Sequence, residues 1–188
     1  MKLIVGITGA TGVQMGYRLL QALTVFDDVE KHLIISEGAK TVFDLETDLN
    51  LEDVYALADY VHDAGNLGAT IASGSFKTDG MAIVPCSMKT LSAISNGYAD
   101  NLISRSADVC LKENRRLVLV PREMPLNIIH CRNLLTAAEA GCTIIPPMLT
   151  FYSNSLTVED QVDHVIGKVL MQFGLEYDKF EAWRGNEK

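Results

Sequence analysis

The sequence predicts an α/β fold in which a doubly wound parallel sheet lies between layers of helices, within one domain that spans residues 1–188. Short apolar runs of the kind that a sheet buried on both faces requires recur along the chain, and helical patterns alternate with them. A glycine-rich turn directly after the first run is typical of the same class of fold. With 188 residues, 48% of them hydrophobic, the chain suffices for one full core rather than two.

Five apolar runs are predicted strands, and six helical patterns are predicted helices. The strands are Lys2–Val5, His32–Ser36, Met81–Pro85, Leu117–Val120 and Thr143–Ile145. The helices are Gly12–Thr24, Glu37–Glu46, Met88–Asn96, Leu102–Glu113, Asn127–Ala140 and Val158–Phe173. Right-handed crossovers between parallel strands give this alternation a Rossmann-like topology. Residues 62–80, rich in Gly, Ser and Asp, are predicted to form a long surface loop that is functional or mobile.

Charge and cysteine content argue against several functions. The net charge of −8 disfavours nucleic acid or an anionic membrane surface as a partner. No apolar run approaches the roughly 18 residues that a membrane span needs. The cysteines show no C-x-x-C spacing, so neither a zinc site nor a redox pair is indicated. We expect a cytoplasmic protein with reduced thiols and no metal.

The glycine-rich turn Gly6-Ile7-Thr8-Gly9-Ala10-Thr11-Gly12 follows the first predicted strand and opens into a helix. Such a turn presents free backbone N–H groups beside the positive end of a helix dipole, where a phosphate can bind. It is not the dinucleotide fingerprint G-x-G-x-x-G, because its glycine spacing differs. Thr11 is predicted to cap the helix. The turn indicates a phosphate-bearing cofactor without saying which one.

The other strand ends carry polar groups that we expect to share one edge of the sheet, where ligands bind in such folds. Ser36-Glu37 follows the second strand, and the segment 85–90, Pro-Cys-Ser-Met-Lys-Thr, follows the third. Arg122-Glu123 follows the fourth strand between Pro121 and Pro125, and this rigid bracket favours a functional role over an ordinary turn pair. Ser87 and Thr90 are equally well explained as helix caps, and Lys89 as a solvated side chain.

Residues elsewhere have simpler explanations. Arg105, Asp108 and Lys112 share one helix face, which surface ion pairs explain. A lone glutamate such as Glu46, at the end of a helical pattern, usually faces solvent. The two histidines without a partner at ligand spacing are interpreted as structural; they are His62 and His130.

Several enzyme classes lack their signatures in this sequence. No tyrosine has a lysine four positions on, and Gly167-Lys168 lacks the earlier glycine of a P-loop. Neither H-E-x-x-H nor G-x-S-x-G occurs. Metal-assisted hydrolysis and acyl transfer are therefore disfavoured.

Taken together, the motifs resemble the UbiX-type flavin prenyltransferases, and the resemblance runs from residue 2 to Trp183. The branch it is closest to is the one described as small subunits of phenolic-acid or hydroxybenzoate decarboxylases. The segments that carry it, in order, are 8–12 (TGATG), 45–48 (LETD), 72–76 (ASGSF), 85–91 (PCSMKTL), 107–113 (ADVCLKE), 119–125 (LVPREMP) and 146–152 (PPMLTFY).

The resemblance implies a single FMN-binding flavoprotein domain that joins a dimethylallyl group from dimethylallyl monophosphate to reduced FMN without a metal. The prenylated FMN would then serve a UbiD-type decarboxylase. It also implies a homo-oligomer, a dodecamer with sites at subunit interfaces, in which residues 175–188 form an arm at an interface.

Site residues follow from matching positions in the family. The catalytic set would be Glu46, Glu123, Thr11 and Trp183, with Glu46 acting through the hydroxyl of Thr11. The FMN-binding set would be Gly9, Ala10, Thr11, Ser36, Ser87, Met88, Lys89, Thr90, Arg105 and Arg122. The substrate phosphate would be held by Lys112, Arg122, Tyr152 and Lys168. A metal-free cleavage of an allylic C–O bond needs such cations for the departing phosphate, an aromatic face for the allyl cation and a carboxylate base.

Two positions depart from the family pattern. Thr11 replaces a frequent serine, which keeps the hydroxyl but restricts its rotamers. Lys168 replaces a frequent arginine, which keeps the charge but loses the bidentate fork.

Two alternative functions remain open at this point. One is an FMN-dependent cysteine decarboxylase, which shares the first turn but has an asparagine-containing motif where this chain has Cys86-Ser87-Met88-Lys89. The other is a non-catalytic flavin-binding subunit that escorts an aromatic acid decarboxylase.

Overall fold

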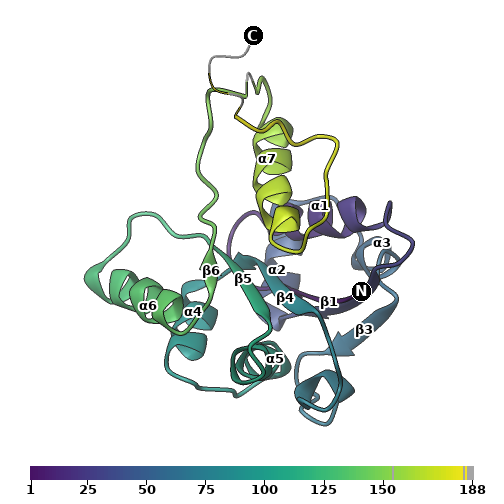
Figure 1. Ribbon diagram of the computed structural model, residues 1–188, viewed down its shortest axis with the longest axis vertical. Coiled ribbons are helices and arrows are strands. Elements are labelled where there is room, and N and C mark those ends of the chain that lie inside the picture. The colour runs from purple at the N-terminus through teal and green to yellow at the C-terminus, as the bar shows by residue number, and fades with distance from the viewer. Residues whose placement is uncertain (154, 184, 186–188) are drawn as a thin grey trace.

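The protein, described here from a computed structural model in residues 1–153, 155–183 and 185, is built on one parallel sheet (Figure 1). The sheet has six strands in the order β3-β2-β1-β4-β5-β6, and every neighbouring pair is parallel. The strands are β1 Lys2–Ile7, β2 Glu30–Ile35, β3 Tyr60–Asp63, β4 Gly80–Cys86, β5 Arg116–Pro121 and β6 Thr143–Ile144. This is the predicted doubly wound, Rossmann-like topology.

Seven α-helices and one 3₁₀ helix connect the strands within the described residues. They are α1 Val13–Leu23, α2 Glu37–Glu46, α3 Leu51–Tyr55, the 3₁₀ helix η1 Thr70–Ala72, α4 Met88–Ser95, α5 Leu102–Lys112, α6 Ile128–Glu139 and α7 Val158–Met171. None of these helices has the length and apolar character needed to cross a bilayer.

The sheet is buried on both faces because its strands alternate their apolar side chains between two cores. Leu3, Val5 and Ile7 of β1 pack into one core with α1 and α7. Ile4 packs into the other core with residues of α4 and α5. Figure 1 shows α1 and α7 on one side of the sheet and α4 and α5 on the other.

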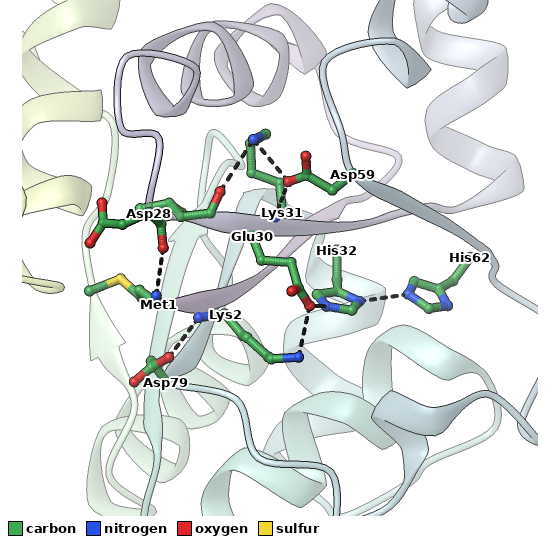
Figure 2. Close-up of polar contacts among 10 residues, drawn as sticks. Met1, Lys2, Asp28, Glu30, Lys31, His32, Asp59, His62 and Asp79 are labelled. Carbon is green, nitrogen blue, oxygen red and sulfur yellow. Dashed lines mark hydrogen bonds and ion pairs between the residues drawn. The ribbon is translucent and has the colours of Figure 1, made fainter.

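A polar network holds the amino-terminal edge of the sheet (Figure 2). The backbone N–H of Lys2 donates to the Asp79 carboxylate at 2.6 Å, and that of Lys31 donates to Asp59 at 2.7 Å. The Glu30 carboxylate lies between Lys2 Nζ, at 3.0 Å, and the buried His32 ring, at 2.8 Å. These contacts satisfy backbone donors at the amino ends of the strands. A ligand would bind at the opposite edge of the sheet, beyond the carboxyl ends.

His62, which sequence analysis left without a partner, belongs to the same network. Its Nε2 lies 3.0 Å from Nδ1 of His32, and the two rings stack with centroids 5.3 Å apart. The pair joins the edge strand β3 to β2. This contact with His32 gives His62 a structural role, as the sequence analysis expects.

The segment 62–80 is largely the irregular, exposed stretch that the sequence predicts, but it is attached to the core. It begins with the last residues of β3, includes η1, and buries Ile71 at 1% exposure. Arg115 fastens it by donating to the carbonyl oxygens of Gly74 at 2.6 Å and Phe76 at 2.9 Å. The polar composition agrees with the solvent exposure of most of the segment, but it gave no indication that an arginine from another element would bind two of its backbone carbonyls.

Candidate active site

A cavity of about 540 Å³ opens at the carboxyl ends of the strands. It lies at the topological switch point, because β1 and β4 are neighbours while the chain winds outward from each of them in opposite directions. Gly9 after β1, Ser36 after β2, Ser87 and Lys89 after β4, and Glu123 after β5 all line it. The structure therefore brings together most of the residues predicted from the strand ends.

Close backbone contact shapes the floor of this cavity. A Cβ on Gly9 would lie 2.9 Å from the carbonyl carbon of Gly38, so no larger residue fits without backbone movement. The buried hydroxyl of Thr8 donates to the Pro85 carbonyl at 2.9 Å and accepts from the Ser87 N–H at 2.7 Å. The loops after β1, β2 and β4 are thereby held in one arrangement.

Two helices begin at the cavity with serine caps. Ser36 Oγ accepts from the Ala39 N–H at 3.1 Å, and Ser87 Oγ accepts from the Thr90 N–H at 3.3 Å. The capping explanation is thus confirmed for Ser87 but not for Thr90, whose N–H is the donor. Ser36 caps α2 in the same way, and both serines also line the cavity. Helix amino termini carry partial positive charge, and the exposed Lys89 adds a full charge in the first turn of α4. The arrangement suits a phosphate.

The prediction that Thr11 caps α1 is wrong. The N-cap is Gly12, whose φ of 89° lies in the left-handed region that glycine adopts without strain. In place of a side-chain cap, the Gly12 N–H donates to Glu46 Oε2 at 3.0 Å. Glu46 is therefore not simply solvated; its carboxylate sits at the positive end of α1.

Glu46 and Thr11 line a second cavity of about 500 Å³ between α1 and the start of α7. No hydrogen bond joins the Thr11 hydroxyl to Glu46 in the residues described here. The Glu46 carboxylate accepts instead from the backbone N–H of Gly12, and the relay through Thr11 stays a prediction.

Arg122 and Glu123 lie where β5 ends beside β4. The Arg122 N–H donates to the Cys86 carbonyl at 3.1 Å. The exposed Glu123 carboxylate accepts from the Met124 N–H at 3.0 Å. Burial raises the pKa of the neighbouring Cys86 thiol far above its usual value, so this cysteine does not act as a nucleophile.

Four predicted basic residues lie outside the cavity lining, and two of them, Arg105 and Lys112, belong to α5. Arg105 donates through Nε to the Ala72 carbonyl at 3.0 Å and pairs with Asp108 at 2.7 Å, which agrees with the surface ion-pair explanation. Lys112 pairs instead with Glu113, beyond the last turn of α5. This 11-residue helix is about 16 Å long, and it leads from the cavity, where Ile103 lines the wall, back toward the start of β5.

A separate cluster beside α7 contains three more predicted residues. The rings of Tyr152 and Trp183 meet edge to face with centroids 5.4 Å apart. Lys168 Nζ lies 5.1 Å from the centroid of the Phe180 ring, a cation–π contact. The segment after α7 thus packs on its own helix, and the part of the predicted interface arm at residues 184 and 186–188 lies outside the described residues.

Salt bridges and hydrogen bonds anchor α7 to the sheet domain. Arg18 of α1 donates to both carboxylate oxygens of the buried Asp163, at 2.6 and 2.8 Å. The Tyr177 hydroxyl donates to the same carboxylate at 2.6 Å. The aromatic cluster is therefore held on a rigid support.

Sequence reasoning missed several residues of these sites. Gly38, Gly65 and Asn101 line the first cavity, and His164 lies in the aromatic cluster. Asn101 caps α5 through a capping box, a signal readable in the sequence. Gly65 follows an Asp63 turn that was assigned to the loop. The position of His164 depends on tertiary packing, which carries no local signal.

The first cavity fits a phosphate-bearing flavin. Its volume lies in the usual range for small-molecule sites. Two helix amino termini, a lysine and several hydroxyls supply donors for a phosphate. Among the described residues, no group of three or more His, Cys, Asp or Glu side chains is placed to hold a metal ion. The cysteines, all of which are described, are free thiols.

Comparison with known proteins agrees with this geometry. The model of the Flavoprotein family matches residues 1–171. A probable UbiX-like flavin prenyltransferase from Sedimentibacter hydroxybenzoicus is 61% identical, and the alignment covers 100% of this chain and 99% of that protein.

Two solved structures are also closely similar. A dodecameric FMN-dependent UbiX-like decarboxylase from Escherichia coli O157:H7 superposes with a TM-score of 0.96 at 55% identity, covering 98% of this chain and 100% of that one. AnUbiX (PadA1), solved in complex with FMN and dimethylallyl pyrophosphate, gives a TM-score of 0.95 at 49% identity, covering 99% of this chain and 98% of that one. This chain belongs to the Flavoprotein family and, within it, to the UbiX-like flavin prenyltransferases.

Proposed function

We propose that this protein transfers the dimethylallyl group of dimethylallyl monophosphate to reduced FMN and that the prenylated FMN serves a UbiD-type decarboxylase. The observation that carries the proposal is the cavity at the switch point, with phosphate-binding helix termini on its wall and Glu123 at its lining. The complex of AnUbiX with FMN and dimethylallyl pyrophosphate supports FMN and a dimethylallyl phosphate ester as the ligands.

The FMN phosphate and ring are assigned to residues that line or adjoin this cavity. The hydroxyls of Ser36, Ser87 and Thr90 and the charge of Lys89 surround the space between the starts of α2 and α4. Gly9 keeps the approach open, since any side chain there would collide with Gly38. Met88 and Ile103 supply apolar surface for the ring. Bound reduced FMN supplies the nucleophilic nitrogen and carbon that accept the prenyl group.

Proton removal is assigned to carboxylates of this chain. Glu123 is the base: its carboxylate lines the cavity and has a single described hydrogen bond, to a backbone N–H at 3.0 Å. Glu46 assists from the neighbouring cavity, with its charge fixed at the amino terminus of α1 by Gly12. A positioned carboxylate contributes about 10²- to 10⁴-fold to such a proton transfer.

Phosphate departure is assigned to the cations and to Tyr152. Arg122 stands next to Glu123, whereas Lys168 and Tyr152 come from the α7 cluster and Lys112 from the far end of α5. Trp183, with 66% of its surface exposed beside Tyr152, offers an aromatic face to the allyl cation. Positive charge around the leaving group favours C–O cleavage without a metal.

These residues meet when several copies of the chain assemble, and we propose a homo-oligomer, a dodecamer like the E. coli relative. In one chain, Arg105 and Lys112 and the α7 cluster lie outside the cavity lining. Large apolar side chains are also exposed on and near α6 and before α7; they are Met124, Leu126, Ile128, Ile129, Leu135, Met148, Leu149, Phe151 and Leu156. A monomer rarely exposes this much apolar surface, and a second copy would cover it.

The decisive experiment is anaerobic incubation of the purified protein with reduced FMN and dimethylallyl monophosphate, followed by mass spectrometry of the extracted flavin. We expect a gain of one five-carbon prenyl unit, and activation of a UbiD-type decarboxylase at catalytic amounts of this protein. Unmodified FMN from protein that binds both ligands would favour a cysteine decarboxylase or an escort subunit.

Free thiols are consistent with the cytoplasmic location that we assign to the reaction.

A further inference from the structure

His164, on the second turn of α7, has no role in the reaction as assigned above. Its side chain is only 5% exposed, and its ring packs on Phe180 with centroids 5.0 Å apart. Phe180 is seated against Gly167, where a Cβ would lie 2.4 Å from the phenyl ring. The imidazole is therefore enclosed by α7 and by the segment that follows it.

The two ring nitrogens of His164 have different surroundings. Nε2 lies 3.2 Å from the hydroxyl oxygen of Tyr152. Nδ1 is buried and has no hydrogen-bond partner in the described part of the chain. Burial, together with the charge of Lys168 one turn away, lowers the pKa of His164, so the ring is neutral at neutral pH.

The different surroundings of the two nitrogens favour one of the two neutral tautomers of His164. If the proton is on Nδ1, a buried N–H has no acceptor, and Nε2 accepts a hydrogen bond from the Tyr152 hydroxyl. With the proton on Nε2, the N–H donates to the Tyr152 oxygen, and only a lone pair is left unpaired. Orphaned buried N–H groups are rarer in proteins than acceptors with an unused lone pair, so the Nε2–H tautomer is favoured.

We propose that His164 is a positioning residue that donates from Nε2 to the Tyr152 oxygen and thereby frees the Tyr152 O–H to donate to the substrate phosphate. The inference rests on the proposed function, in which Tyr152 binds that phosphate. Tyr152 is 42% exposed, so its proton has access to a ligand on the open side of the cluster. The Tyr152 hydroxyl has a single proton to donate. If His164 accepted that hydrogen bond, Tyr152 could no longer donate to the substrate phosphate.

The test compares His164→Leu with His164→Gln in the intact oligomer, in both wild-type and Tyr152→Phe backgrounds. Calorimetry with inorganic phosphate and with dimethylallyl monophosphate measures affinity without turnover. Solid-state NMR of protein labelled with [¹⁵N]histidine identifies the tautomer, and the His164→Leu spectrum assigns the signal. Tyr177→Phe is the matched control, because it removes a phenol hydroxyl that bonds to Asp163 on the same helix.

We expect an Nε2–H signal for His164 and a three- to tenfold weaker affinity for dimethylallyl monophosphate in His164→Leu, the loss of about one ordinary hydrogen bond. His164→Gln, whose terminal amide keeps a donor near Nε2, should restore most of that loss. In the Tyr152→Phe background, His164→Leu should have no further effect.

An Nδ1–H signal would overturn the inference, and so would an undiminished effect of His164→Leu in the absence of the Tyr152 hydroxyl. Wild-type protein that binds neither ligand would also overturn it. The proposed function fails by a different result: a wild-type protein that binds dimethylallyl monophosphate but leaves reduced FMN unmodified. The affinities and the tautomer would still decide the role of His164 in that case.

Discussion

At the scale of single residues, some side chains that follow the strands both stabilise a helix and line the cavity. Ser87 caps α4 and also lines the cavity, so its two explanations are compatible. Glu123 differs because it caps no helix and forms no described ion pair. An exposed carboxylate held by one backbone N–H is available for proton transfer.

Replacing Glu123 with Gln should separate binding from chemistry. The amide keeps the size of the side chain but cannot accept a proton, so the rate of prenylated-FMN formation should fall by about 10²-fold or more. FMN affinity should stay within a few-fold, since the change leaves the serine caps and Lys89 intact. Stopped-flow absorbance under anaerobic conditions gives the rate, and fluorescence titration gives the affinity. Product formation at the wild-type rate would remove Glu123 from the role of base.

His62 makes the stability of the β3 edge depend on pH. Burial, with the nearby His32 ring, lowers the pKa of His62 below its unfolded value of 6.5. Between these two pKa values the unfolded chain binds more protons than the folded one, so stability falls as the pH drops through 6.5. The stability advantage of wild type over His62→Gln should therefore shrink between pH 7 and pH 5. Urea denaturation at fixed protein concentration measures it, and a constant difference across this range would contradict the assignment.

At the scale of elements, the contact between the first two loops tests how the cavity is formed. Gly9→Ala would place a Cβ 2.9 Å from the Gly38 backbone, whereas Gly38→Ala meets Gly9 Cα at an ordinary 3.5 Å. We expect Gly9→Ala to cost about 1–3 kcal/mol of unfolding free energy. Gly38→Ala, in the first turn of α2, should be neutral or stabilising by up to about 1 kcal/mol. Equal effects in denaturant titrations of the FMN-free protein would show that the close contact does not shape the cavity.

Most strands and helices were predictable from sequence, and the strand and the α-helix that were missed, β3 and α3, are short and largely exposed. The strands β1, β2, β4 and β5 are continuous apolar runs, since both faces of the sheet are covered. The edge strand β3 was missed because Tyr60 and Val61 are half exposed and polar residues follow them. Its pairing with β2 depends on His32 and His62, which are distant in sequence. The helix α3 was missed because its five residues, of which Val54 alone is buried, are too few to show a helical period.

The candidate site was predictable where it lies at strand ends and was less so elsewhere. The rule that ligands bind beyond the carboxyl ends located Gly9, Ser36, Ser87 and Glu123. The same rule leaves the partners of Tyr152 unspecified, because they come from α7 and from the segment after it. No local signal indicated His164.

At the scale of the whole molecule, the separation of the proposed catalytic groups is the main feature to explain. Glu123 lines the cavity, whereas Lys112 is the last residue of α5 and pairs with Glu113. A rigid α/β core gives no means of bringing them together within one chain. Assembly through the exposed apolar surface on α6 would let one copy supply its cations to the cavity of another.

Mixing two inactive variants tests this arrangement directly. Lys112→Ala keeps Glu123, and Glu123→Gln keeps Lys112, so a site shared between unlike copies contains both intact residues. Random assembly of equal amounts should restore activity in about a quarter of the sites. Anaerobic prenylation by co-expressed, co-purified oligomers measures it.

The matched control mixes Glu123→Gln with Arg122→Ala, two substitutions at adjacent positions that directly follow β5 in the same chain. Every site built on either copy then keeps one defect, so this mixture should stay inactive although its oligomers form equally well. If both mixtures are inactive, Lys112 and Glu123 of one site come from the same chain, and α5 must move to bring Lys112 to the cavity. If only the first mixture recovers, the functional unit is the interface between copies, and isolated subunits should bind FMN yet fail to prenylate it.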